Sequence, residues 1–444
     1  MSKYFSGRKA PAPRWHNWGR TVSCAPSRTE LPSDALQISR IVTGAAESGA
    51  TVKPVGAGHS FTSIAATDDI RLDLRNMRGL SGVDTTRKQV TLYAGTHLHE
   101  IPGLLAPHGL AMANLGDIDR QTISGAISTG THGTGLGFGG IATQIVGAKL
   151  VTGTGEIRTV SAGDDDLRAV ALGLGALGVL AEVTVQCVDA FCLRAEERPR
   201  TADEAFGTFL DEVAAQDHYE FYWFPHTSQT LTKTNTRLPA GTDPDGPGKV
   251  RRYVDDELLS NKMFRALCEV GVKAPRLVKP INQLTSRALS ARTFTDVSTG
   301  VFTSSRNVRF GESEFAIPLE AVPEALRDLR NMIDRKGFRV SFPIEVRAAG
   351  ADDLLLSTAS GRDSGYIAVH RYHRDDPADS AAYFAGFEAI MVGYGGRPHW
   401  GKLHTRDASY FREAYPGFEE FLAVRDRYDP DRVFANPYLK KVLG

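Results

Sequence analysis

Hydrophobic and polar positions in the first 110 residues predict two helices separated by several short strands. Apolar residues recur near helical spacing in one segment: Leu36, Ile41, Val42 and Ala45. Ser33 is the expected N-cap of this helix, and Gly49 is the expected end. A short second helix is predicted over 98–109, ending at Gly109. Apolar runs between the two helices predict strands at 51–55, 70–74 and 88–95.

The pattern beyond residue 140 combines hairpins with longer helices. A hairpin is predicted over 145–161, and a polar joint followed by an amphipathic helix over 194–216. The segment 237–256, rich in Gly, Pro and Asp, is expected to be a surface insertion. The remaining expected elements are an aromatic strand at 219–225, a helical stretch to about 293, strands at 306–318, 342–349 and 365–373, a helix at 320–337, and a last helix. This mixed order predicts an α+β fold.

Composition excludes several classes of protein. A chain of 444 residues with 41% hydrophobic residues suits two or three soluble domains. Lys and Arg total 52, as do Asp and Glu, which argues against a nucleic-acid partner. No apolar run approaches the length of a membrane span, although contact with a membrane surface stays open. Four scattered cysteines predict reduced thiols and a cytoplasmic location.

Two glycine-rich stretches suggest a cofactor site. In "VGAGHSF" the third glycine of a dinucleotide-binding loop is replaced by Phe61, and His59 follows the second glycine. The run from Asn114 to Gly140 lacks the G-K-[ST] ending of a P-loop. Its glycines, serines and threonines would let backbone N–H groups approach a polyanion or a flat ring. A tight crossover between packed sheets is the alternative for this run.

These stretches, with "GLGALGVLAEVTV" at 173–185, resemble in order the FAD domain of vanillyl-alcohol-oxidase type flavoproteins. "FPIEVR", "RPHWGKLH" and "DPDRVFANPYL" are similar to motifs of the aldonolactone oxidases and dehydrogenases. The resemblance spans nearly the whole chain. It implies an α+β protein with a two-subdomain FAD-binding domain at 15–190 and a substrate (cap) domain with an antiparallel sheet at 191–444. The segment from about 395 to 444 is expected to pack back on the FAD domain.

The resemblance also implies which residues bind FAD. His59 would carry a covalent bond to the flavin 8α-methyl group, or alternatively only a hydrogen bond to phosphate. Ser124 would lie near the reactive edge of the flavin, and the backbone of Val179 and Leu180 near the adenine half. The complete expected set is Val55, Gly56, Ala57, Gly58, His59, Ser60, Gly116, Ser124, Gly125, Thr129, His132, Gly133, Val179 and Lys402.

The strand "FPIEVR" carries the main candidates for catalysis. Side chains alternate along a strand, so Glu345 and Arg347 share one face, where they could simply form an ion pair. By the same alternation His370 shares a face with Tyr372. Gly401 beside Lys402 could allow close approach to a planar ring.

The resemblance gives these side chains roles. Arg347 is assigned to the substrate oxygen, and Lys402 to the flavin N1–C2 edge or the alkoxide. Glu345 is assigned to sugar hydroxyls and to the orientation of Arg347. His370 is the weaker candidate for a base, and Ser124 completes the catalytic set.

The implied reaction is oxidation of a sugar 1,4-lactone such as L-gulono-1,4-lactone at a secondary hydroxyl. The expected electron acceptor is oxygen or a redox carrier such as cytochrome c. An alditol oxidase acting on a terminal hydroxyl is the alternative, and "FPIEVR" and Tyr372 favour the lactone. A metallohydrolase is disfavoured, because "HLHE" and "HWGKLH" lack the H-E-x-x-H spacing, and no metal is expected.

Overall fold

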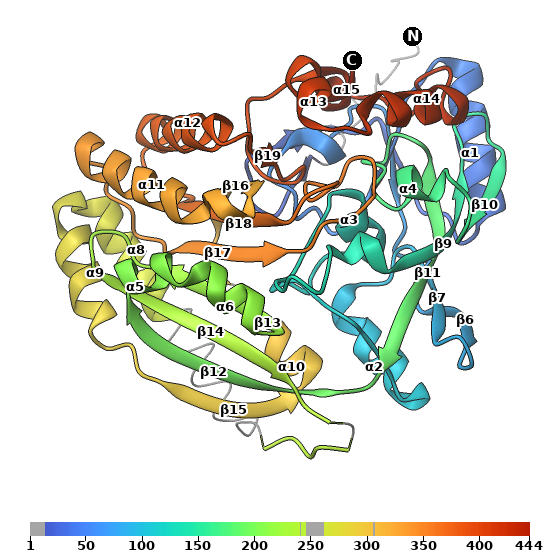
Figure 1. Cartoon of the computed structure of the whole chain (residues 1–444). Helices are drawn as coiled ribbons and strands as arrows, with labels where there is room; N and C mark the ends of the chain where they lie inside the picture. Colours follow the sequence, from blue (N-terminus) through green and yellow to red (C-terminus); the bar gives the residue numbers. More distant parts are fainter. Residues whose placement is uncertain (1–13, 240, 246–261, 305–306) are drawn as a thin grey trace, which may run out of the picture.

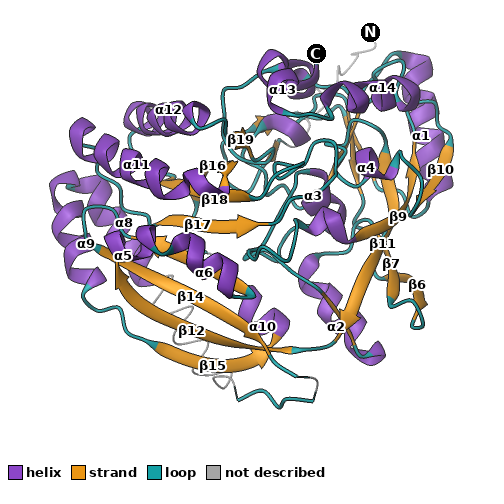
Figure 2. Cartoon of the chain, in the orientation of Figure 1, coloured by secondary structure: helices purple, strands orange, loops and turns teal. Residues whose placement is uncertain are grey.

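The structure is a computed structural model that describes residues 14–239, 241–245, 262–304 and 307–444. The strands of these ranges form a two-stranded ribbon and sheets of three, six and eight strands. Figures 1 and 2 show the eight-stranded sheet on one side of the molecule and the six-stranded sheet on the other. The ribbon pairs β1 (Trp15–His16) with β2 (Ser23–Cys24).

The three-stranded sheet is parallel, with β5 (Ile70–Asp73) between β3 (Arg28–Glu30) and β4 (Val52–Val55). Helix α1 (Ala35–Ser48) connects β3 to β4, as such a parallel crossover requires. β4 leads directly into the loop that begins at Gly56. The strand therefore fixes where this loop starts.

The N-cap of α1 is Asp34 rather than Ser33. The Asp34 carboxylate accepts the Gln37 backbone N–H at 2.8 Å, while the Ser33 hydroxyl accepts only from the Gln37 side chain. Asp34 has extended backbone angles immediately before the first helical residue, which is the position that an N-cap needs. Gly49 ends the helix with φ +67°, as expected.

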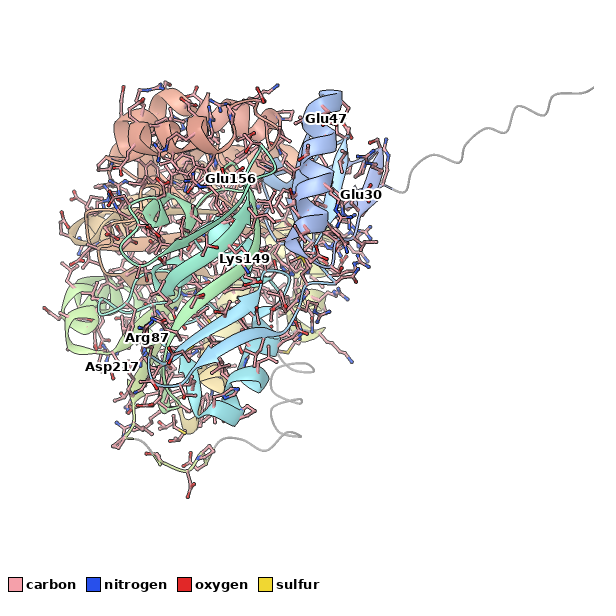
Figure 3. All side chains as sticks on the ribbon, turned by 90° about the vertical axis from the view of Figure 1, so that its right-hand side faces the viewer. Glu30, Glu47, Arg87, Lys149, Glu156 and Asp217 are labelled. Atoms are coloured by element: carbon pink, nitrogen blue, oxygen red, sulfur yellow. The ribbon has the colours of Figure 1, made fainter. Side chains whose placement is uncertain are left out.

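The six-stranded sheet is antiparallel. The second glycine-rich run, residues 114–140, connects its strands β8 and β9. Figure 3 views this side, with Lys149 on β9 and Arg87 in the turn between β6 and β7. The strands in spatial order are β10 (Ile157–Ser161), β9 (Ile145–Val151), β11 (Val179–Asp189), β7 (Gln89–Tyr93) and β6 (Leu80–Asp84), with β8 (Leu110–Met112) paired to the end of β11. Short helices α2 (Ile101–Leu105), α3 (Ile123–Ser128) and α4 (Leu167–Val170) connect them.

The eight-stranded sheet is also antiparallel, and it draws its strands from widely separated parts of the chain. In spatial order these are β15 (Arg292–Val297), β12 (Cys192–Thr201), β14 (Gln229–Arg237), β13 (His218–Trp223), β17 (Ile344–Ala349), β18 (Ser364–Tyr372), β16 (Phe310–Pro318) and β19 (Arg397–Pro398). β17, which holds "IEVR", lies near the middle between β13 and β18.

The two faces of this sheet differ in chemistry. One face buries Phe221, Val346, Ile367 and Phe315 beneath helices α5 (Ala202–Gly207), α6 (Phe209–Ala215), α11 (Val322–Lys336) and α12 (Pro377–Gly393). Alternation and register place a different set on the opposite face: Glu220, Tyr222, Lys233, Glu312, Glu314, Glu345, Arg347 and His370. We call this set the charged face.

Helices at the C-terminus share a core with the first part of the chain. Phe411 of α13 (Ala408–Ala414), Phe421 of α14 (Phe418–Tyr428) and Val442 of α15 (Pro437–Leu443) belong to the same buried cluster as α1 and the two smaller sheets. Hydrogen bonds reinforce the contact, because the Val52 N–H donates to the Val433 carbonyl at 2.8 Å. The chain thus returns to its start after completing the large sheet (Figure 1).

The remaining helices are α8 (Met263–Lys273), α9 (Val278–Ser286) and α10 (Ser298–Phe302). α12, with 17 residues, is the longest helix described. Within the described ranges, no helix has both the length and the apolar character needed to cross a membrane.

Several predicted elements are wrong. The expected polar joint near 194–200 is strand β12, whose backbone pairs on both sides with β14 and β15 while its side chains remain largely polar. The helix after it is split at Thr208, and the helical stretch toward 293 ends at Ser286, followed by β15. Four helices, not one, follow β18. Most of the expected insertion at 237–256 lies outside the described residues.

Candidate active site

A cleft with an empty volume of about 800 Å³ opens where β4 runs into the loop of residues 56–60. The first turn of α3 and the turn at 174–180 form its other walls. This volume includes open solvent at the mouth of the cleft, so the residues that form the walls, rather than the volume, indicate what the cleft can bind.

Glycines bring the walls of this cleft together. A Cβ atom at Gly56 would lie 2.3 Å from Thr122 Oγ1, and one at Gly178 would lie 2.6 Å from the Val151 carbonyl oxygen. Gly58 has φ +71°, a conformation that favours glycine. Because these positions have no side chain, the walls can pack closely, and the backbone of the loop could approach a bound ligand.

The second glycine-rich run connects the cleft to the charged face. Near the cleft, the Ser124 hydroxyl donates to the Ala94 carbonyl at 2.7 Å. Further along, the Gly135 N–H donates to the Ala348 carbonyl of β17 at 2.8 Å. The Ala348 N–H in turn donates to Thr134 Oγ1 at 3.2 Å. The run therefore attaches β17 to the cleft-forming part of the chain.

Arg347 on the charged face is held between two carboxylates. Its Nε donates to Glu220 Oε2 at 2.6 Å, and its Nη2 lies 2.5 Å from Glu345 Oε1. Burial alone would lower the pKa of Arg347, but Glu220 and Glu345 raise it well above its ordinary value. Burial raises the pKa of Glu345, and the opposing effect of Arg347 does not cancel this shift because Glu220 and Asp117 add to it.

Lys402 occupies a similar position between two other carboxylates. Its ammonium contacts Glu312 and lies 3.9 Å from Glu314 Oε2. Burial would lower the pKa of Lys402, yet these carboxylates raise it, so the side chain remains a cation. Although burial favours the neutral acid, Lys402 and His370 lower the pKa of Glu312 to about 2.

Two imidazoles complete the charged network. His132 Nε2 lies 3.1 Å from Glu314 Oε1, and its Nδ1 lies 2.9 Å from the Gly133 carbonyl oxygen. His370 Nε2 lies 3.5 Å from Glu312 Oε1, and its Nδ1 lies 3.3 Å from the Pro343 carbonyl oxygen. Both nitrogens of each ring face acceptors, so neither ring presents a lone pair to the cleft.

The cleft and the charged face meet at Lys402. The Phe61 N–H donates to the Gly401 carbonyl at 2.6 Å, and Lys402 Nζ lies 5.6 Å from the Phe61 ring centroid. A Cβ at Gly401 would lie 3.1 Å from Ser60 Oγ. Glycine at this position therefore allows the C-terminal segment to lie against the loop of residues 56–60, which we call the cofactor loop.

His59 lies at the same junction. Its ring stacks on Trp18 with centroids 5.5 Å apart. Burial, with further contributions from Lys402, His97 and Arg120, lowers the pKa of His59 to about 4. Its imidazole is consequently neutral at physiological pH, the form in which a ring nitrogen can act as a nucleophile.

The expected cofactor residues fall into two groups. Those that line the cleft are Val55, Gly56, Ala57, Gly58, His59, Ser60, Ser124, Gly125 and Thr129. Gly116, His132 and Gly133 do not line it: a Cβ at Gly116 would lie 2.9 Å from the His132 carbonyl oxygen, and one at Gly133 would lie 2.3 Å from the Leu115 carbonyl oxygen. Val179 is buried between Gly178 and Leu180, which do line the cleft. Glu345, Arg347, His370 and Lys402 belong to the charged network beside it.

Sequence reasoning missed three carboxylates of this network. Glu312 and Glu314 on β16 contact Lys402 and His132, and Glu220 on β13 contacts Arg347. The spacing of two in "GESEF" is the same signal that identified "IEVR", because alternate residues of a strand share a face. Glu220 stands between aromatic residues in "YEFYW", where the only signal was a charge inside an apolar strand.

The cleft suits FAD on the basis of its own walls. Backbone donors of the glycine loop could accommodate a diphosphate, and Gly56 packs so closely against Thr122 that no side chain fits at this position. When bound, FAD would supply a hydride acceptor beside the charged face. Loop residues 56–60 would hold it, with Ser124 and Gly125 on the second wall.

Comparison with known proteins identifies the families that match the two parts of the chain. A model of the FAD binding domain matches residues 26–161, and one of D-arabinono-1,4-lactone oxidase matches residues 183–442. The L-gulono-1,4-lactone dehydrogenase of Mycobacterium tuberculosis (strain ATCC 25618 / H37Rv) is 40% identical over 433 residues, covering 98% of this chain and 100% of that protein. The L-gulonolactone oxidase of Bos taurus is 33% identical over 440 residues, covering 97% and 98%.

The fold also has solved counterparts. A crystal structure of cholesterol oxidase from B. sterolicum superimposes with a TM-score of 0.83 at 19% identity, covering 97% of this chain and 96% of that one. This likeness confirms the expected α+β architecture of the vanillyl-alcohol-oxidase type, with an FAD-binding part and an antiparallel cap sheet. The matched families and the 40% identical relative show that the chain is an FAD-linked oxidoreductase belonging to the D-arabinono-1,4-lactone oxidase family.

Proposed function

We propose that this protein oxidises L-gulono-1,4-lactone, or a closely related sugar 1,4-lactone, at a secondary hydroxyl, giving an ascorbate-type product. FAD would accept the hydride at flavin N5. The main observation behind this proposal is that Lys402 lies between the cofactor loop and the charged face of the eight-stranded sheet. Carboxylates of that face hold both Lys402 and Arg347 in position as cations. Family membership and the names of the relatives support the substrate class.

The chain's own residues suit this chemistry. Loss of the hydroxyl proton places negative charge on the substrate oxygen, which Arg347 would stabilise. Lys402, fixed by Glu312 and Glu314, would place a second cation beside the cofactor loop. Both cations are already positioned by carboxylates, so little rearrangement is needed as charge develops.

Glu345 is the better candidate for the proton acceptor, and His370 the weaker one. Glu345 has a raised pKa, and a proton acceptor works best when its pKa approaches the operating pH. Glu345→Gln should therefore slow flavin reduction and weaken lactone binding. In the wild type, the reduction rate should fall as pH decreases through the raised pKa, because the protonated carboxyl cannot accept a proton. Stopped-flow reduction as a function of pH measures both effects.

His370→Ala is the matching variant. It should retain the pH dependence of flavin reduction, because both ring nitrogens of His370 face acceptors. A large rate loss together with a lost pH dependence would instead make His370 the base. The FAD absorbance spectrum reports whether either variant retains the cofactor.

We also propose that FAD is covalently attached through His59. The neutral imidazole at the cleft supports this linkage. Acid precipitation should leave the yellow colour with the protein, and a peptide containing His59 should carry the mass of FAD. His59→Ala should release the flavin into the supernatant. Free flavin from the wild type would contradict the covalent bond while leaving FAD binding intact.

A substrate panel tests the reaction. Stopped-flow reduction should be faster with 1,4-lactones than with open-chain alditols, the substrates of the alternative alditol oxidase. Tyr372, which favoured the lactone in the sequence, lies beyond the charged network, where its hydroxyl donates to Glu269 Oε1 at 2.7 Å. Faster reduction by an alditol would reverse the assignment.

The same panel addresses the electron acceptor, for which we propose oxygen or a redox carrier such as cytochrome c. Reoxidation of the reduced protein by each acceptor separates oxidase from dehydrogenase.

We place the protein in the cytoplasm, consistent with its four unpaired cysteines. We further propose that residues 15–190 bind FAD and residues 191–444 cover it, with 395–444 returning to the FAD side.

A further inference from the structure

A row of charged side chains crosses three neighbouring strands of the eight-stranded sheet: β14, β13 and β17 (Figure 1). Lys233 on β14 stands opposite Glu220 on β13 in the strand register. β13 and β17 in turn pair Phe221 with Val346. The same register places Glu220 beside Arg347 on the charged face. Positive and negative charges therefore alternate along this row.

Each side chain of the row contacts the next. Lys233 Nζ lies 3.6 Å from Glu220 Oε1, and it also donates to the Val301 carbonyl of α10 at 2.9 Å. The other oxygen of Glu220 accepts from Arg347 Nε at 2.6 Å. Arg347 Nη2 then lies 2.5 Å from Glu345 Oε1. Two carboxylates therefore share one guanidinium, and only Glu220 contacts Lys233 as well.

The two carboxylates that share Arg347 differ in their surroundings. Burial favours the neutral acid, yet Arg347 and Lys233 together lower the pKa of Glu220. Glu345 forms an ion pair with Arg347 alone among the described residues. Burial raises the pKa of Glu345 against the opposing effect of Arg347, and Glu220 adds to the rise. The Glu345 side chain is also the more accessible, at 15% exposed against 6% for Glu220. Glu220 is therefore the carboxylate that stays ionised, and Glu345 the one that can bind a proton.

We propose that Glu220 and Lys233 are positioning residues for the oxidation. They hold Arg347 in line for the substrate oxygen, and they determine how readily Glu345 accepts the hydroxyl proton. This inference rests on the proposed role of Glu345 as the proton acceptor. Other titratable or charged groups that act on Glu345 stay in place in the variants below: Asp117, Tyr222, His370 and Lys402.

Replacing Glu220 with Gln should make Glu345 a stronger acid. Gln retains an oxygen that can accept from Arg347 Nε, but it removes the negative charge that favours the protonated form of Glu345. The pKa of Glu345 should fall, and the loss of flavin reduction at low pH should move about one pH unit downward with it. Infrared difference spectra of the titrated holoenzyme follow the band of the protonated carboxyl, which Glu345→Gln identifies by removing it.

Lys233→Met should produce the opposite shift. It removes the cation that balances Glu220 while keeping a side chain of similar length, so the negative charge beside Arg347 is less compensated. The pKa of Glu345 should rise, by less than it falls in Glu220→Gln, because Lys233 is further from Glu345 along the row. Lost packing would lower the rate in both variants without moving this pKa in opposite directions.

A third variant tests the alignment of Arg347. At a pH where Glu345 is ionised in every form, Glu220→Gln should retain most of the rate of flavin reduction. Glu220→Ala should lose on the order of tenfold, because Arg347 Nε then has no acceptor on β13 and the guanidinium is less well fixed. The flavin absorbance spectrum verifies that each variant retains FAD.

Matched controls are Glu182→Gln and Lys149→Met, since this pair lies 3.0 Å apart on the six-stranded sheet. Both should leave the carboxyl band and the pH profile unchanged. The inference would be overturned by unmoved bands in Glu220→Gln and Lys233→Met, by shifts in the same direction, or by a wild type without a Glu345 band. The band is recorded without substrate. Failure of the lactone to reduce the flavin would therefore count against the proposed function alone, while the band still decides this inference.

Discussion

Replacing Arg347 with Ala is expected to slow flavin reduction by the lactone by about 10²–10³-fold, while FAD remains bound. The guanidinium is buried and held by Glu220 and Glu345, so it is aligned before substrate arrives. Its removal takes away the cation that would stabilise the substrate oxygen as its proton leaves. FAD retention is expected because Arg347 does not line the cleft. Stopped-flow reduction and the flavin absorbance spectrum measure the two effects.

Arg330→Ala is the matched control for this experiment. Arg330 pairs with Asp203 at 2.6 Å and lies on α11, which covers the apolar face of the same sheet. Its loss should leave the reduction rate near the wild-type value. Arg347→Lys should recover only part of the rate, because a lysine cannot bridge Glu220 and Glu345 as a guanidinium does. A rate near the wild type for Arg347→Ala would refute the role of the charged face.

Replacing Lys402 with Ala is expected to reduce the rate of flavin reduction about 10²-fold and also to destabilise the protein. The second effect arises because Glu312 and Glu314 would lose their ammonium partner inside the protein. Breaking a buried ion pair on one side typically costs about 3–5 kcal/mol. Thermal unfolding and stopped-flow reduction separate stability from rate.

A double variant distinguishes the two effects. Lys402→Met combined with Glu312→Gln removes both partners of the closest pair, so it should recover much of the stability of the wild type without recovering its rate. Lys149→Ala is the control, because Lys149 pairs with Glu182 at 3.0 Å on the six-stranded sheet. Recovery of the rate in the double variant would mean that Lys402 serves only to balance the carboxylates.

Some elements could be predicted because their signals are local. Gly49, Gly109 and Gly337 each follow a helix in the left-handed conformation that glycine adopts readily. The strand of "FPIEVR" follows from its alternation, and it forms β17. Strand β12 could not be found in this way. Its sequence "RAEERPR" is polar, and only pairing with β14 and β15 makes it a strand.

The candidate site was predictable to the extent that its motifs are contiguous. "VGAGHS" and the run from Asn114 to Gly140 predict a cofactor site. Residues 56–60 of the first motif and Ser124 of the second line the cleft. Glu220 was not predicted because its partner, Arg347, is 127 residues away in the chain. Patterns of sequence spacing relate residues within one helix or strand, so they do not predict contacts between distant segments.

The sequence by itself determined the family, the glycine loop with His59, and the alternation that puts Glu345 and Arg347 on one side of a strand. These features depend on a few adjacent residues, whose backbone geometry and side-chain direction are set locally. Only the tertiary structure decided which groups surround them. Strand order brought Glu220, Glu312 and Glu314 to the cations, and packing of the C-terminal segment brought Lys402 to the loop. Burial then altered the pKa of His59 and of Glu345, because the cost of a buried charge depends on every neighbouring segment.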